Sequence, residues 1–209
     1  MKIAILGTGN VGSALGKRWA ANGHEIIFGS REPESDKVRG LVQAAGGKTS
    51  AATYAGAVNQ ADVILLATPF HSAQETLASL GSLGGKLLID ATNPFGPSMR
   101  LIPWPDSSAA EQIASWAADA KVVKAFNMTG SGNMANTDYG AMKPAMFICG
   151  EDGAAKNVVL GLSNEIGFDT IDCGPLTAAR YLEAIVGLWV NLAYTQGMGP
   201  NMAFALLRR

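Results

Sequence analysis

The sequence predicts an α/β fold, in which a doubly wound and mostly parallel sheet is followed by a small, mainly helical C-terminal part. Two observations predict this fold. Apolar runs of about five residues alternate with stretches of helical period, which is the pattern of βαβ units. A glycine-rich turn directly follows the first apolar run and begins the first helical stretch. The first strand, turn and helix are therefore expected to be contiguous.

Seven apolar runs are predicted to be strands. They cover residues 2–6, 25–28, 62–67, 86–90, 122–125, 145–149 and 168–172. Between the first two runs, Val11, Leu15 and Trp19 recur every four residues, which gives a helix one apolar face that can lie on the sheet. Further helices are predicted at residues 37–45, around 52–57, 72–79, 109–117 and 154–165.

Two long connections interrupt this alternation. Residues 92–107 contain four prolines, and residues 127–144 are rich in Gly, Asn and Met. Connections of this length inside a compact domain are usually functional or mobile.

The composition is that of an ordinary globular chain without a strong charge bias. Of its 209 residues, 48% are hydrophobic and 16% are charged, which suits one large domain or one domain with an appendage. The 16 Lys and Arg residues against 17 Asp and Glu residues give a net charge of -1, and no basic run is present. Nucleic acid is therefore not expected as a partner.

The chain is expected to stay in the cytoplasm and outside the membrane. Met1 leads directly into the first strand, without the basic segment and longer apolar stretch of a secretion signal. The apolar segment 184–194 is interrupted by Asn191 and is shorter than the roughly 20 residues of a membrane helix. Cys149 and Cys173 lack metal-type spacing, so they are expected to be buried thiols, with a redox role as the alternative.

The pattern changes late in the chain. Leu182, Val186 and Trp189 keep helical spacing, but further apolar residues make the same helix apolar on several sides. Such a helix must be covered, either by the core of a small second lobe or at a subunit interface. We therefore expect one domain over residues 1–124 and a C-terminal part over residues 125–209, which holds further strands and buried helices.

The glycine-rich turn has the spacing G-x-G-x-x-G of a dinucleotide-binding loop, in the required context between a strand and a helix. The first glycine permits the tight turn, the second lets the backbone approach a pyrophosphate, and the third lets helix and strand pack closely. Free N–H groups at the helix N-terminus then bind the phosphates. The loop consists of Gly7, Thr8, Gly9, Asn10, Val11 and Gly12. The first domain is therefore predicted to be a Rossmann domain.

The end of the second strand favours NADP over NAD. A carboxylate there would bind both ribose hydroxyls and repel a 2′-phosphate, but Gly29, Ser30 and Arg31 stand in its place. The Ser30 hydroxyl can donate to a phosphate oxygen, and Arg31 can bind the phosphate through two N–H groups while it stacks on adenine. Lys37 either adds a third positive contact or is a solvated helix residue.

The ends of later strands are expected to border the ribose and the nicotinamide. In open α/β sheets, ligands lie beyond the carboxyl ends of the strands, where the strand order reverses. The candidates at these ends are Thr68, Pro69, Asn93, Asn127 and Met128.

Few side chains are suited to proton transfer. His24 lies in a turn and is expected to be structural, whereas His71 lies near a strand end without an identifiable carboxylate partner. Neither a Ser-His-Asp set, nor paired acids, nor a metal-binding cluster can be assembled, so no catalytic residue and no metal ligand is predicted. Hydride exchange between two ring cofactors needs positioning rather than an acid–base group, which favours a flavin-like second substrate.

Several stretches together resemble the F420-dependent NADP oxidoreductases. They are the loop at 7–12, Gly29-Ser30-Arg31, Lys124-Ala125-Phe126-Asn127, Cys149-Gly150-Glu151-Asp152 and Asp172-Cys173-Gly174-Pro175-Leu176. The same stretches are similar to the cytoplasmic NADPH-binding domains of membrane metalloreductases. The resemblance implies a Rossmann domain with a helical C-terminal part, often in a dimer, and hydride transfer between NADP and a deazaflavin.

The resemblance also implies roles for particular residues. Thr8 to Val11 would hold the pyrophosphate, Ser30 and Arg31 would bind the 2′-phosphate, and the turn at 197–200 would border the deazaflavin. The family's phosphate-binding lysine matches Lys37 only when the alignment is offset.

These expectations describe an NADP-dependent oxidoreductase that exchanges hydride with a flavin or with F420. One alternative is an imine or hydroxyacid reductase, although only about 35 residues follow Gly174, where those enzymes have a much longer helical domain. The other alternative is an NADPH sensor without turnover. A homodimer with a small-molecule electron partner is expected, and the acceptor and the direction of transfer stay open.

Overall fold

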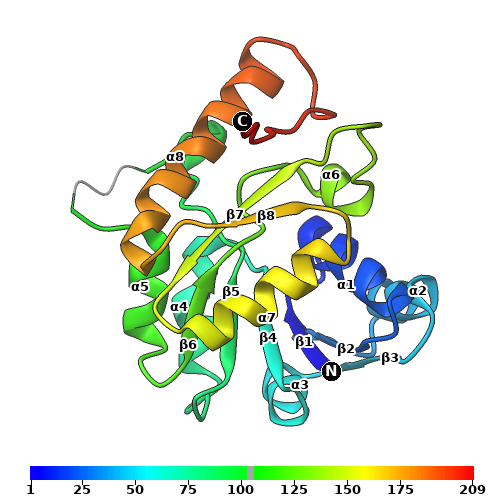
Figure 1. Cartoon of the computed structure of the whole chain (residues 1–209). Coiled ribbons are helices and arrows are strands. Elements are labelled where there is room, and N and C mark those ends of the chain that lie inside the picture. Colours follow the sequence, from blue (N-terminus) through cyan, green and yellow to red (C-terminus); the bar gives the residue numbers. More distant parts are fainter. Residues whose placement is uncertain (103–105) are drawn as a thin grey trace.

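The computed structural model describes residues 1–102 and 106–209, so Pro103 and Pro105 of the predicted long connection lie outside the described residues. In the described part of the chain, one eight-stranded sheet has the order β3-β2-β1-β4-β5-β6-β7-β8 (Figure 1). Its strands are β1 (Lys2–Leu6), β2 (Glu25–Gly29), β3 (Thr49–Ala52), β4 (Val63–Leu66), β5 (Leu87–Asp90), β6 (Lys121–Lys124), β7 (Ala145–Gly150) and β8 (Asp169–Asp172). Among these strands, β6 and β7 pair antiparallel and the other neighbours pair in parallel. The predicted fold class is confirmed.

Helices cover both faces of the sheet. One apolar core lies between the sheet and α1 and α7, and the other lies between the sheet and α3, α4 and α5. The helices are α1 (Asn10–Ala21), α2 (Asp36–Ala45), α3 (Tyr54–Gln60), α4 (Phe70–Ala78), α5 (Ala109–Trp116), α6 (Ser131–Ala135), α7 (Gly153–Asn164) and α8 (Ala179–Val190). Short 3-10 turns at Pro97–Met99 and Leu176–Ala178 and a π-turn at Asn191–Thr195 complete the described helical structure.

Two elements differ from the sequence prediction. Residues 49–52 form an edge strand, and α3 begins only at Tyr54, so the helix expected around 52–57 starts later. This strand has the sequence Thr-Ser-Ala-Ala, which lacks the large apolar side chains of a typical strand, and it pairs on one side with β2. Helix α6 lies inside the connection at 127–144, where five residues give too little periodicity to detect.

The C-terminal part continues the sheet of the first domain. Strands β7 and β8 follow β6, so the expected boundary at Lys124 falls at the end of β6 within one sheet. Helix α8 buries Leu182, Val186 and Trp189, while Tyr181 and Leu188 on the same helix are 74% and 51% exposed. Figure 1 shows the first turns of α8 next to α5 and the rest of α8 extending past the sheet. In the described residues, no helix has the length and the apolar character that a membrane span requires.

Two glycines of the first loop are required by the fold itself. Gly7 has a φ of +116°, and a Cβ there would lie 2.6 Å from the carbonyl oxygen of Ala67. A Cβ at Gly12 would overlap the carbonyl oxygen of Gly7 and lie 2.9 Å from Cγ2 of Ile5. By contrast, a Cβ at Gly9 would meet nothing within 4 Å. Gly7 and Gly12 therefore allow the close packing of β1, α1 and the β4 loop, as predicted for the motif.

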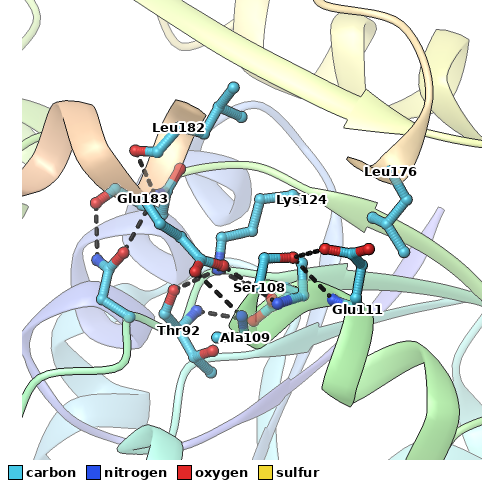
Figure 2. A network of polar contacts seen from close by, with 12 residues as sticks. Thr92, Ser108, Ala109, Glu111, Lys124, Leu176, Leu182 and Glu183 are labelled. Atoms are coloured by element: carbon cyan, nitrogen blue, oxygen red, sulfur yellow. Dashed lines mark hydrogen bonds and ion pairs between the residues drawn. The ribbon is translucent and has the colours of Figure 1, made fainter. Parts of the chain in front are cut away.

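A buried ion network lies beyond the carboxyl ends of β5 and β6 (Figure 2). The Lys124 Nζ lies 2.9 Å from Asp90 Oδ2 and 3.4 Å from Glu183 Oε1, and it also donates to the carbonyl oxygen of Thr92. The Lys124 and Asp90 side chains are fully buried. Glu183 belongs to α8, so this network connects α8 to the ends of two central strands.

The charges around Lys124 determine the pKa of its ammonium group. Burial alone would lower the pKa of the Lys124 ammonium, but the Asp90 and Glu183 carboxylates beside it outweigh burial and raise that pKa above its ordinary value of 10.5. Lys124 is therefore charged at neutral pH, and it compensates two carboxylates that would otherwise be buried without a cation.

Gly12→Ala is expected to lower the free energy of unfolding by about 1–3 kcal/mol, because the new methyl group must displace the Gly7 carbonyl or Ile5. Gly9→Ala is the matched control and should change it by less than about 1 kcal/mol, since its methyl group has open space. Urea denaturation followed by circular dichroism measures both values. Equal losses in the two variants would contradict the packing role of Gly12.

Lys124→Met is expected to lower the free energy of unfolding by about 3–5 kcal/mol at pH 7, because it leaves buried carboxylates without a cation. The raised pKa means that the stabilisation by Lys124 is fully present below pH 10.5 and is lost as the pH rises through the folded-state pKa. The difference between the proteins should therefore shrink only in strong alkali. Denaturation at several pH values tests this, with Lys121→Ala at the half-exposed Lys121–Asp152 pair as a control of small effect. A loss no larger than that of the control would refute the role of the network.

Candidate functional site

The amino end of α1 presents unpaired backbone N–H groups. Gly9 is its N-cap residue, and no side-chain cap hydrogen bond and no acidic residue in the first turn occupies these groups. The macrodipole of α1 adds partial positive charge at the same end. Gly9 itself leaves open space, so a phosphate group can approach this backbone.

A cavity of about 510 Å³ lies beside this helix end. The described residues that line it are Thr8, Ser30, Arg31, Glu32, Ser35, Lys37, Val38 and Tyr54. Ser30 Oγ accepts the N–H of Glu32 at 3.1 Å, which leaves its hydroxyl hydrogen free to donate to a ligand. The structure thus brings Ser30, Arg31 and Lys37 to one cavity, although they come from the end of β2, the loop after it and the first turn of α2.

The balance of charge in this cavity favours an anion. Arg31 and Lys37 are both exposed, and neither forms an ion pair with another residue that the structure describes. Glu32 also lines the cavity, so the two cations are partly offset. A phosphate group bound between Arg31 and Lys37 would complete the charge pairing that the protein alone leaves open.

A second cavity of about 430 Å³ adjoins the first, because Arg31 and Tyr54 line both. Its other described residues are Thr68, Pro69, His71, Ser72, Glu75, Thr76 and Ser79. Arg31 and Tyr54 present a guanidinium plane and a ring between the cavities, which suits a flat base. His71 therefore lies on this side of the site, together with Arg31 rather than with the asparagines at the ends of β5 and β6.

Asn93 and Asn127 form a reciprocal pair beyond the ends of β5 and β6. Asn93 Nδ2 donates to the Asn127 carbonyl at 2.8 Å, and Asn127 Nδ2 donates to Asn93 Oδ1 at 3.1 Å. Asn127 Nδ2 also donates to the carbonyl of Leu182 in α8 at 3.2 Å. The structure therefore joins two predicted site residues that are far apart in the sequence.

Three buried side-chain oxygens near these strand ends lack a hydrogen-bond partner in the described part of the chain: Thr68 Oγ1, Thr92 Oγ1 and Asn127 Oδ1. Buried polar atoms are normally paired, so unpaired atoms at the carboxyl edge of a sheet indicate a site for a polar ligand. Phe126, the residue before Asn127, has a φ of +57°, a left-handed conformation that is costly for a bulky residue. A strained residue beside a buried amide oxygen that lacks a partner is typical of a functional site.

Met128 lies apart from this group. Its side chain is buried in the core, and its sulfur accepts the N–H of Phe147 at 3.2 Å. Pro69 is the N-cap residue of α4 and lines the second cavity.

The motifs that follow β7 are structural. Asp152 caps α7 through the N–H of Ala155 at 2.8 Å, and Glu151 accepts the N–H of Leu176 at 3.0 Å. Burial raises the pKa of the Cys149 thiol to about 12, so this thiol is not reactive at neutral pH. These residues identify a fold pattern and do not line the candidate site.

The sequence prediction missed two groups. Tyr54 follows an edge strand that has no clear pattern, so nothing placed it beside Arg31. Glu183 is a lone carboxylate on an apolar helix, and a buried charge of this kind usually needs a partner. That signal was available in the sequence, but it could not identify Lys124 as the partner.

Comparison with known proteins gives the family. A family model described as NADP oxidoreductase, coenzyme F420-dependent, matches residues 2–94. The F420-dependent NADP reductase of Methanothermobacter marburgensis is 35% identical over 207 residues, covering 92% of each protein. Metalloreductase STEAP3 of Rattus norvegicus is 32% identical over 185 residues, covering 88% of this chain and 36% of that protein.

Solved structures give the same result. The crystal structure of a candidate F420-dependent NADP reductase from Arthrobacter sp. FB24 covers 100% of both chains, with 31% identity and a TM-score of 0.90. An imine reductase from Aspergillus terreus covers 94% of this chain and 63% of its own, at 20% identity and a TM-score of 0.68, which shows the fold alone. The chain therefore belongs to the family of the F420-dependent NADP reductases, a family of NADP-dependent oxidoreductases.

Proposed function

We propose that this protein transfers hydride between NADP(H) and an F420-type deazaflavin, with a flavin as the other possible ring acceptor. The observation that carries the nucleotide half of the proposal is the cavity that brings together Ser30, Arg31 and Lys37. The names of the relatives support the acceptor half, because the reductase of Methanothermobacter marburgensis is F420-dependent.

The cavities suit successive parts of an NADP molecule. The pyrophosphate would bind at the amino end of α1, beside the loop of Thr8, Asn10 and Val11. The 2′-phosphate would bind Ser30, Arg31 and Lys37, and the adenine would lie beside Arg31 and Tyr54. Each part of the nucleotide then meets a group whose charge or hydrogen-bonding capacity suits it.

The nicotinamide would lie toward Thr68, Pro69, Asn93 and Asn127. The unpaired Asn127 Oδ1 is an acceptor that suits an N–H of the nicotinamide carboxamide. The Asn93 side chain holds the Asn127 amide in place, because each amide donates to the other residue. Met128 would support this end from the core rather than by contact with the nucleotide.

Hydride transfer between two rings moves two electrons and one proton together, so the protein must bring the two ring carbons close and exclude water. No acid–base side chain is assigned to this step. The proposal holds for either direction of transfer, which the concentrations and potentials of the two cofactors decide.

Three further expectations stay with the proposal. A homodimer would cover the exposed Tyr181 and Leu188 of α8. A cytoplasmic location and the absence of a nucleic-acid partner remain predictions from the sequence. The solved imine reductase supports the alternative of an imine or hydroxyacid reductase only through a shared fold.

Arg31→Ala is expected to weaken NADPH binding by about 10- to 100-fold, because two charge-assisted hydrogen bonds to the 2′-phosphate would be lost. NADH lacks this phosphate, so its affinity should change little. Titration of both nucleotides by fluorescence measures the two constants, and Arg39→Ala, which removes an exposed cation paired with Asp36, is the control. Equal losses for NADPH and NADH would contradict a 2′-phosphate role for Arg31.

Purified protein is expected to oxidise NADPH with F420 faster than with FMN, FAD, quinones or ferric chelates. Absorbance at the NADPH and F420 bands measures each rate. Tight NADPH binding without turnover for any acceptor would favour the sensor, and turnover with cyclic imines or hydroxyacids alone would favour the second enzyme class.

A further inference from the structure

We infer that Glu183 is a positioning residue for the electron acceptor. It holds α8 against the ends of β5 and β6, and it thereby fixes the distance between the nicotinamide and the α8 side chains that the acceptor would contact. This inference rests on the proposed hydride transfer. It assigns a role to a buried carboxylate that binding of the nucleotide does not require.

Glu183 connects three elements by one carboxylate (Figure 2). Its Oε2 accepts the N–H of Ala109 at 3.0 Å, and its Oε1 accepts the N–H of Ala110 at 3.1 Å. The same Oε1 lies 3.4 Å from Lys124 Nζ. The amino end of α5, the end of β6 and the first half of α8 therefore meet at this side chain.

Contacts of Lys124 and of the residue before Glu183 connect this network to the candidate nicotinamide site. Lys124 binds the carbonyl of Thr92, the residue before Asn93. Asn127, three residues after Lys124, donates to the carbonyl of Leu182, the residue before Glu183. The Asn93–Asn127 pair and α8 are thus held by two parallel sets of contacts, and a shift of α8 would move the backbone that carries both asparagines.

A cavity of about 300 Å³ lies between α8 and the loop after β5. Pro94, the neighbour of Asn93, and Ala184, the neighbour of Glu183, both line it, together with Leu101, Ile102, Ser107 and Arg180. Its walls are largely apolar, and Glu183 itself lines it. The flat face of a flavin or deazaflavin ring that approaches the ends of β5 and β6 from α8 would meet this wall, so the position of α8 should affect the acceptor more than NADPH.

Capping of α5 explains only part of the contacts of Glu183. Its carboxylate accepts the N–H groups of Ala109 and Ala110, and Ser108 Oγ accepts that of Glu111 at 3.1 Å, but the contact of Glu183 with Lys124 is no part of this cap. A second link between α5 and α8 lies nearer the surface, where Arg180 forms a two-point ion pair with Glu111 at 2.8 and 3.0 Å. Unlike the Arg180–Glu111 pair, Glu183 also contacts Lys124.

The charges of the network make a mild test feasible. Glu183→Gln removes one of two carboxylates beside a single ammonium, so the Lys124–Asp90 pair stays balanced. The new amide nitrogen is a donor that faces the N–H groups of α5 or Lys124, and it therefore breaks one contact of the old carboxylate. Glu183→Asp keeps the charge, but its shorter side chain cannot reach α5 and Lys124 at once.

The experiment compares Glu183→Gln and Glu183→Asp with the wild type, and Glu111→Gln is the matched control that breaks the other link between α5 and α8. We expect kcat/KM for F420 or FMN to fall by about 10- to 100-fold in both Glu183 variants, because small misplacement of a reacting ring has an effect of this size. The NADPH dissociation constant should stay within about twofold, since the charged contacts proposed for its phosphates, at Ser30, Arg31 and Lys37, lie far from α8. The control should keep its kcat/KM even if it loses thermal stability to the same degree.

The outcomes separate this inference from the proposed function. Absence of turnover in the wild type overturns both. Wild-type turnover with unchanged kcat/KM in the Glu183 variants, or an equal loss in Glu111→Gln, overturns the inference alone. Parallel losses of NADPH affinity and kcat/KM also overturn it, because they indicate general loosening. If Glu183→Gln does not fold, Glu183→Asp, which keeps the buried charge, decides the question by the same measurements.

Discussion

The Lys124 ammonium is the point at which the ends of the central strands and the C-terminal helix are held together. It is fully buried, and its contacts are Asp90 at the end of β5, the carbonyl of Thr92 and Glu183 of α8. Placing charges in the interior costs several kcal/mol per ion, and apolar side chains could fill the same volume more cheaply. What an ion pair adds is direction, because each carboxylate oxygen and each N–H must meet a particular partner. The network therefore specifies where α8 lies on the sheet.

The two halves of the site are built by different means. At the nucleotide end, backbone geometry does most of the positioning: Gly7 and Gly12 allow β1 and α1 to pack closely, and the amino end of α1 then presents its N–H groups. Only the proposed 2′-phosphate seat depends on side chains, chiefly those of Ser30, Arg31 and Lys37, which line one cavity. At the other end, asparagine side chains and the ion network position the site. Substitution of Gly7 or Gly12 should thus act on the fold, whereas substitution of Glu183 should also act on the reaction.

The local motifs agree with the membership of the family, but some of them stabilise the fold and others contribute to the candidate site. The stretches after β7 that resemble the family cap α7 and the turn after β8, so they identify the shape of the chain rather than its chemistry. The stretch Lys124 to Asn127 does both, since its lysine anchors the network and its asparagine borders the site. Phe126 between them is strained, and the surrounding core, in which it is fully buried, holds it in place.

The sequence by itself determined the order of most strands and helices along the chain, and it predicts a seat for a phosphate after β2. Apolar runs of strand length and glycines at fixed spacing are local features, and local features suffice to identify these elements. Only the tertiary structure decided which side chains meet. The strand Thr49–Ala52 was invisible because pairing with β2, and not its own residues, makes it a strand. The tertiary structure placed Tyr54 and His71 in one cavity with Arg31, buried Met128 in the core, and set Glu183 against Lys124. All of these arrangements join segments that are distant in the sequence. Their partners are set by how the sheet twists and how α8 folds back over it, and no spacing along the chain records that geometry.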